Sequence, residues 1–284
     1  MLWAVFAGLS ATIEVFKDGV AKHTSNKHSS VVLAWSFFLI AIPLFAVPYM
    51  LFPPETIHSQ FWWALAARTL LDGTALILFF QAIRSSDISV TIPMISFTPV
   101  FLLLTSPLIG EIIPPLGMLG VSLVVLGAYV THSMRAGGVL EPLKAMISEK
   151  GPRLMLIVAL LWTGSSTFHR IGIDASNAFA WNFFGSLALI LALLPLVILK
   201  RNRLRGTLRS GWWLLAGGAA YALGDTFLML AITHGTVAYS IAIKRLSILG
   251  SVLMGGWLFK EVGLGRRLTG ASVMVLGAIV ILIA

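Results

Sequence analysis

The chain has 284 residues, of which 58% are hydrophobic and 11% are charged, and its formal net charge is +9. Soluble domains carry about 25% charged residues, so this composition excludes a soluble globular domain. A membrane-spanning helix needs about 20 apolar residues, and ten such helices take about 200 residues, which excludes a sizeable domain outside the membrane. The absence of cysteine excludes disulfides and thiolate metal sites. The basic residues lie mostly between apolar runs, where they indicate topology rather than nucleic-acid binding.

Ten apolar runs are separated by short segments with turn or charge signals. They predict membrane-spanning helices at 2–22, 31–52, 61–83, 88–108, 112–132, 153–173, 178–199, 212–234, 237–259 and 267–284. The longest connection, 133–152, separates a first five-helix repeat at 1–132 from a second at 153–284. The second part of this connection predicts a short interfacial helix, with Leu143 and Ile147 on one face.

The two halves repeat each other at a shift of 150 residues. Residues 111–130 and 261–280 share eight identical residues, including the tetrapeptide Val-Leu-Gly-Ala at 125–128 and 275–278. Because five crossings are an odd number, the second half must run inverted to the first. The predicted fold is therefore an all-α integral membrane protein with ten transmembrane helices in two inverted five-helix repeats. Such repeats are typical of secondary transporters, which hold substrate near the bilayer midplane.

Two stretches carry a family resemblance. Residues 82–111 end in Ile-Gly-Glu, and residues 241–278 contain Lys-Arg, Phe-Lys-Glu and Leu-Gly-Ala. These stretches resemble the two halves of drug/metabolite transporters, in the ten-helix EamA-type branch of that superfamily. The resemblance implies alternating access without an ATPase domain, and the chain contains no Gly-x-x-x-x-Gly-Lys phosphate loop.

Ionisable side chains lie inside the predicted spans, where they normally face a partner or a wet cavity. On the first span, Glu14 and Asp18 share a helix face, with Lys17 beside both. They form either a self-neutralising cluster or a gate with a proton-coupling carboxylate. The sixth span, its repeat mate, offers His169 and Arg170 in the corresponding region. Opposite charges on matching helices suit a gate that closes on either side in turn.

Two further spans carry isolated charges. On the third span, Arg68 and Asp72 are four residues apart, which predicts an intrahelical salt bridge. On the eighth span, Asp225 follows Gly224, which allows another backbone to approach closely, so we expect Asp225 to contact another span.

Lys244 and Arg245 are adjacent cations on the ninth span, which contains no acid of its own. Either one of them snorkels to the interface, or both face a central cavity and bind the anionic group of a substrate. The pair resembles the Lys-Arg pair with which plastid sugar-phosphate translocators, distant members of the superfamily, bind phosphate. Here the fourth span has no lysine, unlike in those translocators, which favours a general anion site over a phosphate site.

Other residues are candidates for the wall of such a cavity. Trp35 and Asn182 lie at matching places on the second and seventh spans. Pro93 and Pro99 predict a kink in the fourth span, as is common where a helix lines a cavity.

The leading interpretation is a secondary transporter that moves a small anionic or zwitterionic organic solute. The alternative is a lipid or lipid-headgroup flippase on the same scaffold. We expect no enzyme, because His-Glu-x-x-His and Gly-x-Ser-x-Gly motifs are absent, and neither a cofactor nor a metal. The expected partners are the solute, protons or a counter-substrate, and bilayer lipid, without nucleic acid. We expect a monomer or homodimer, multi-pass in the cell (inner or plasma) membrane.

The distribution of Lys and Arg predicts the orientation. The odd-numbered connections hold fifteen of them and the even-numbered ones essentially none. The positive-inside rule then places the odd connections in the cytoplasm and both termini outside.

Overall fold

The regular elements that the structure describes are all helical. The structure is a computed structural model and describes residues 1–25, 30–133, 138–199, 211–250 and 264–284. The longer helices are α1 (Leu2–Ser25), α2 (Ser30–Leu51), α3 (Ser59–Ser85), α6 (Pro115–Ser133), α8 (Lys150–Asp174), α9 (Ala178–Leu199), α11 (Gly211–His234) and α14 (Leu264–Ile283). The shorter ones are α4 (Ile88–Thr91), η1 (Ile92–Phe97), α5 (Thr98–Thr105), η2 (Ser106–Ile109), α7 (Glu141–Ser148) and α12 (Val237–Lys244).

Six described segments are long and apolar enough to cross a membrane. They are Val31–Leu51, Ser59–Ser85, Ile92–Ile109, Lys150–Asp174, Ala178–Leu199 and Gly211–His234, and shorter apolar helices lie at Pro115–Thr131 and Thr269–Ile283. A multi-pass membrane protein is therefore confirmed, whereas the count of ten crossings stays a prediction. Residues 251–259 of the predicted ninth span lie outside the described residues.

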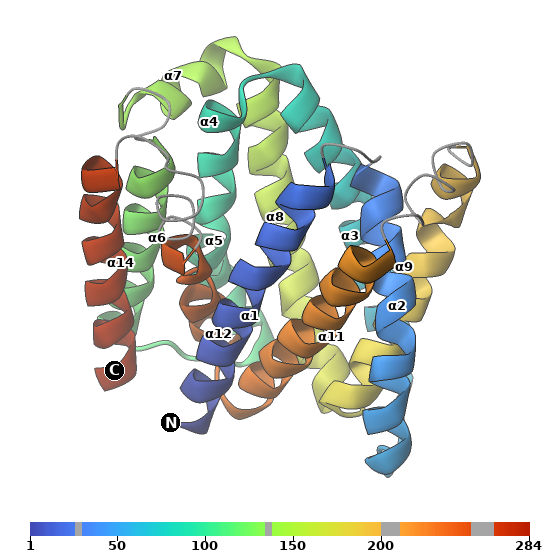
Figure 1. The fold of residues 1–284 in the computed structure, drawn as a ribbon. Coiled ribbons are helices and arrows are strands. Elements are labelled where there is room, and N and C mark those ends of the chain that lie inside the picture. The colour runs from blue at the N-terminus through green and yellow to red at the C-terminus, as the bar shows by residue number, and fades with distance from the viewer. Residues whose placement is uncertain (26–29, 134–137, 200–210, 251–263) are drawn as a thin grey trace.

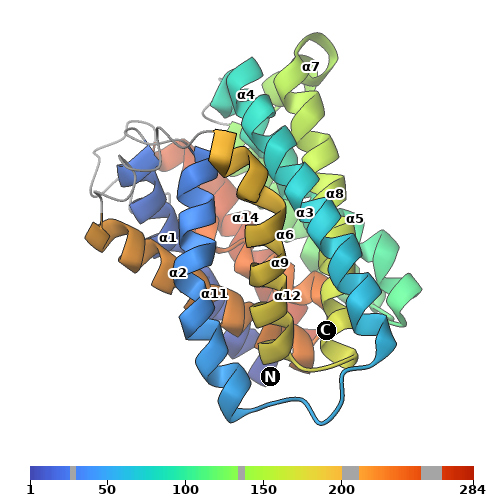
Figure 2. The same ribbon diagram turned by 90° about the vertical axis from the view of Figure 1, so that its right-hand side faces the viewer.

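The helices pack in pairs that the repeat relates. In the sequence repeat, α1 matches α8 and α3 matches α11. The packed pair α1–α11 therefore corresponds to the packed pair α3–α8, and both pairs pack extensively. The same matching relates α2–α11 to α3–α9, while α6 packs against its own repeat mate α14. Figure 1 shows both termini toward the lower end of the bundle and α7 at the opposite end, and Figure 2 shows the same from the side. We call the end that carries the termini the termini side.

A close crossing of α6 and α14 explains part of the sequence repeat. A Cβ atom at Gly127 would lie 2.6 Å from the backbone nitrogen of Met274, and one at Gly270 would lie 2.6 Å from the carbonyl oxygen of Gly127. The repeat mates of these two residues, Gly277 and Gly120, are also glycines, and together the four let the backbones of α6 and α14 touch, as small residues do in membrane helix pairs.

The predicted fourth span is broken into four short helices, α4, η1, α5 and η2. Pro99 has no N–H to bond the carbonyl of Ile95, and the hydroxyl of Thr98 donates to that carbonyl at 2.9 Å instead. The prolines thus coincide with an interruption of the α-helical hydrogen-bond pattern.

The predicted ninth span is also interrupted, and here the expectation of one continuous helix is wrong. α12 ends at Lys244, and Leu246 N–H donates to the carbonyl of Ile243 at 2.9 Å, a tighter pattern than that of an α-helix. At the repeat shift of 150 residues, Lys244–Arg245 corresponds to Met94–Ile95 in η1. Both halves thus carry a break at matching positions.

A short helix, α7, lies where the connection predicts one, and its place at the membrane interface stays a prediction. On it, Leu143 and Ile147 are exposed.

Candidate functional site

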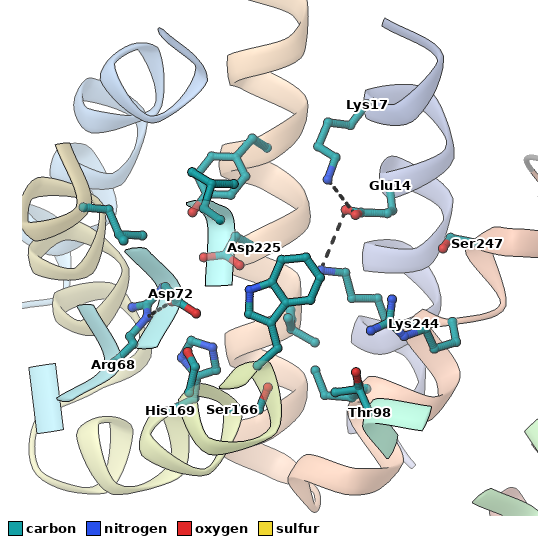
Figure 3. A pocket seen from close by; sticks show the side chains of 18 of the residues that line it. Glu14, Lys17, Arg68, Asp72, Thr98, Ser166, His169, Asp225, Lys244 and Ser247 are labelled. Carbon is teal, nitrogen blue, oxygen red and sulfur yellow. Dashed lines mark hydrogen bonds and ion pairs between the residues drawn. The ribbon is translucent and has the colours of Figure 1, made fainter. Parts of the chain in front are cut away.

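A cavity of about 300 Å³ lies among α1, α3, α8, α11 and α12, beside the break after α12. The side chains that can carry charge in its lining are Glu14, Lys17, Arg68, Asp72, His169, Asp225, Lys244 and Arg245. Figure 3 shows most of them converging on one space. Glu14 lies twelve residues beyond Leu2, about 18 Å along α1. The charges are therefore deep inside the bundle, where the bilayer alone would not tolerate them.

A network centred on Glu14 joins α1 to α12 (Figure 3). Lys17 Nζ lies 2.6 Å from Glu14 Oε1, and Lys244 Nζ lies 3.7 Å from Glu14 Oε2. The side chains of Glu14 and Lys244 are 21% and 25% exposed, so both reach the cavity. Lys17 Nζ also lies 3.7 Å from Asp18 Oδ1, so two carboxylates face two ammonium groups in this network.

A second network lies on the opposite side of the cavity. Arg68 and Asp72 form the salt bridge predicted from their spacing, with Arg68 Nε 3.3 Å from Asp72 Oδ2. The Arg68 guanidinium lies over the ring of Trp181, 5.2 Å from its centroid. The indole N–H of Trp181 donates to Nδ1 of His169 at 2.8 Å. That bond assigns the ring proton of a neutral His169 to Nε2, which makes the imidazole a hydrogen-bond donor.

Three charged side chains of the lining have buried atoms without a hydrogen-bond partner among the described residues. These atoms are Nη1 of Arg68, Oδ2 of Asp225 and Nε of Arg245. Buried charged groups are normally paired, so these atoms lack a partner that such groups usually have. The lining contains three carboxylates and four permanently charged bases, which leaves one positive charge in excess.

Asp225 lies where α1 packs against α11, and a Cβ at Gly224 would meet Ile13 of α1 at 3.4 Å, an ordinary contact. The hydroxyl of Ser10 on α1 donates to the carbonyl of Gly224 at 2.8 Å. Asp225 itself lines the cavity beside residues of α1, α3 and α12.

Six of the ten predicted site residues line the cavity, namely Glu14, Lys17, His169, Asp225, Lys244 and Arg245. Two of the other four are charged and lie elsewhere. The Asp18 side chain is 50% exposed and lies 3.7 Å from Lys17 Nζ. Arg170 pairs with Asp174 at 2.8 Å and donates to the carbonyls of Ile232 and Gly235. Arg170 therefore stabilises the end of α11 and does not oppose Glu14 across the cavity.

The remaining two predicted residues pack between helices. The indole N–H of Trp35 donates to the carbonyl of Ile190 at 3.1 Å, which ties α2 to α9. Asn182 is 1% exposed, and its side-chain atoms have no partner among the described residues. Neither belongs to the described cavity lining.

The lining also contains residues that the sequence did not assign to a site, including Arg68, Asp72, Ser166 and Tyr221. Arg68 and Asp72 pair within one helix, so their spacing predicts a salt bridge and gives no sign of a cavity. The informative signal was the repeat itself, because it matches the broken fourth span to the position of Lys244–Arg245.

The described residues contain no group of three or more His, Asp or Glu side chains that could hold a metal ion. Outside the spans, burial raises the pKa of Glu111, whose carboxyl accepts the backbone N–H of Val237.

Comparisons with known proteins agree with this architecture. One solved crystal structure of another protein matches 99% of this chain and 97% of its own, with a TM-score of 0.78 and 15% sequence identity. At this identity the match shows the fold alone. No curated protein matches the sequence. A model of the EamA-like transporter family matches residues 1–133 and 150–283. The chain therefore belongs to the EamA-like transporter family, a group of membrane transporters of the drug/metabolite type.

Proposed function

We propose that the chain is a secondary transporter that carries a small anionic or zwitterionic organic solute by alternating access. The solute would occupy the cavity beside Lys244 and Arg245, with its anionic group on these two side chains. The observation that carries this proposal is the unpartnered Nε of Arg245 in a cavity whose permanent bases outnumber its carboxylates.

The charges suit both solute classes. Arg245 offers a planar donor group for a carboxylate or phosphate, and Lys244 adds a point charge. The free oxygen of Asp225 is an acceptor that can receive an ammonium group of a zwitterion. His169 and the hydroxyl groups of Ser166 and Tyr221 add neutral polar contacts around the same space.

Binding would also act on the conformation. Glu14 lies in the first family-matched segment and Lys244 in the second, and their ion pair joins the two. A solute anion competes with Glu14 for Lys244 and so weakens this connection between the halves. Such a ligand has different interaction energies with the linked and unlinked states, which a ligand-driven conformational change requires.

Ligand binding to the purified protein tests the proposal. We expect small organic anions or zwitterions to raise the melting temperature in a metabolite screen, because a ligand that binds only the folded form stabilises it. We expect the same ligands to lose this effect when Arg245 is replaced by Gln. Stabilisation by organic cations alone would contradict the proposal.

A second assay separates a solute carrier from a flippase. Proteoliposomes should exchange the stabilising solute across the membrane without scrambling fluorescent phospholipids. Lipid scrambling in the absence of solute exchange would replace the proposal with the flippase.

A further inference from the structure

We propose that Glu111 is a positioning residue that holds the termini side of the cavity closed by bonding the first residue of α12. The inference rests on the proposed alternating access and concerns a residue outside the cavity. Glu111 lies between η2 and α6 and is 8% exposed.

The Glu111 carboxyl group connects the two halves of the chain. The backbone N–H of Val237 donates to both of its oxygens, at 3.0 Å to Oε1 and 3.1 Å to Oε2. The hydroxyl of Ser106 donates to Oε2 at 3.3 Å, which orients the group from its own half. Glu111 belongs to the first family-matched segment and Val237 to the second. A buried carboxyl group with three donor contacts is thus placed across the boundary along which the halves must move.

The bonded residue begins the helix that carries the proposed anion site. Thr236 caps α12 by accepting the N–H of Tyr239, and Glu111 satisfies the N–H of Val237 that this cap leaves free. Lys244 is seven residues farther along the same helix, about 10 Å away. Because α12 is a single short helix, holding its first residue also restrains the position of Lys244.

The packing around the start of α12 is buried and apolar. A hydrophobic core that includes Ala7, Leu102, Ile232, Val237 and Ile241 joins α1, α5, α11 and α12. An opening on the termini side would require α12 to separate from these neighbours, and the carboxyl of Glu111 bonds its backbone at that place.

Two other hydrogen bonds on the termini side join residues in loops and do not involve α12. The N–H of His58 donates to the carbonyl of Ala175 at 3.0 Å, and the Asn177 side chain donates to the carbonyl of Phe52 at 3.0 Å. Neither contact reaches α12. Among these contacts, the one made by Glu111 therefore bears most directly on the position of α12.

Cysteine labelling tests the inference, because the chain has no cysteine of its own. The reporter is Ser166→Cys, a cavity residue on α8, treated with a membrane-impermeant maleimide from one side of the membrane. The exposed Glu55, between α2 and α3, identifies the termini side when replaced by Cys in a separate protein. The variants to compare in the reporter protein are Glu111→Ala, Glu111→Gln and the matched control Glu55→Gln.

We expect Glu111→Ala to speed labelling of the reporter from the termini side by about tenfold, because it removes both acceptors of the Val237 N–H. Glu111→Gln keeps the size of the side chain and one acceptor oxygen, so it should restore most of the protection. Glu55→Gln should leave the rate unchanged. Equal labelling rates in the parent and Glu111→Ala proteins would overturn the inference.

A second reporter separates gate opening from unfolding. Met155→Cys lies in a different buried cluster, which packs α8 against α3, η1 and α6. It should stay protected in Glu111→Ala, and its labelling at the same rate as Ser166→Cys would show global unfolding and contradict a local gate. Labelling requires no substrate. An opened gate in a protein that carries no solute would overturn the proposed function alone, whereas unchanged labelling in an active transporter would overturn the gate alone.

Discussion

Arg245 and Lys244 are both positively charged, but only Arg245 has a planar donor group with a free buried N–H. Arg245→Lys keeps the charge and removes the fork that binds carboxylate or phosphate in two places. We expect the KM for solute exchange to rise about tenfold in Arg245→Lys, with normal amounts of protein in the membrane. Lys244→Arg is the matched control, since it adds a fork where a point charge was present, and should be tolerated better. An unchanged KM in Arg245→Lys would mean that charge alone is recognised.

The Arg68–Asp72 salt bridge matters for the free energy of unfolding because both side chains are largely buried. Their side chains are 4% and 17% exposed, so removing one partner leaves a buried, unpaired charge. Breaking such a pair costs about 3–5 kcal/mol, whereas replacing both partners with apolar residues can be neutral. Asp72→Leu should therefore lower the melting temperature in detergent strongly, and the double change Arg68→Met with Asp72→Leu should recover much of the loss. A double variant less stable than Asp72→Leu would contradict this account.

At the scale of helices, the crossing of α6 and α14 depends on the absence of side chains at matched glycines. Adding a Cβ at Gly127 forces the two backbones apart, because it would lie 2.6 Å from the nitrogen of Met274. We expect Gly127→Ala to destabilise the protein by about 1–3 kcal/mol, measured as a lower melting temperature in detergent. Gly8→Ala in α1 is the control, since nothing lies within 4 Å of the added atom, and it should be neutral or slightly stabilising. Equal effects of the two changes would show that the crossing tolerates separation.

The sequence predicts best those elements that form through interactions between residues near one another in the chain. Hydrophobic runs, the repeat and the proline break in the fourth span are local patterns, and all of them were readable from the chain. No proline or glycine near Lys244 marks the end of α12 in the sequence. The chain turns there through backbone hydrogen bonds, such as the one from the N–H of Leu246 to the carbonyl of Ile243. The placement of Arg170 at the end of α11 depends on a contact between residues 62 positions apart in the sequence.

The same distinction holds for the candidate site. Spacing along a helix identifies partners within that helix, such as Arg68 and Asp72. It does not show which other helices these two side chains face. Only the folded bundle brings Asp72 to the cavity that Lys244 also lines.

For the whole molecule, the distribution of charge predicts the orientation in the membrane. Lys144 on α7 is exposed at the end opposite to the termini, and Glu55 is exposed on the termini side. The positive-inside rule places the α7 end in the cytoplasm. In intact cells, an impermeant maleimide should label Glu55→Cys and leave Lys144→Cys unlabelled. The reverse result would place the termini in the cytoplasm.

The central claim is that the two halves enclose a site at Lys244 and Arg245 where a solute anion is carried across the membrane. Counterflow of the stabilising solute in proteoliposomes measures this most directly, for the wild type, Lys244→Gln and Arg245→Gln at equal protein content. The account predicts rapid exchange in the wild type and loss of nearly all exchange in both variants, with the bundle still folded. Exchange at the wild-type rate in both variants would contradict it.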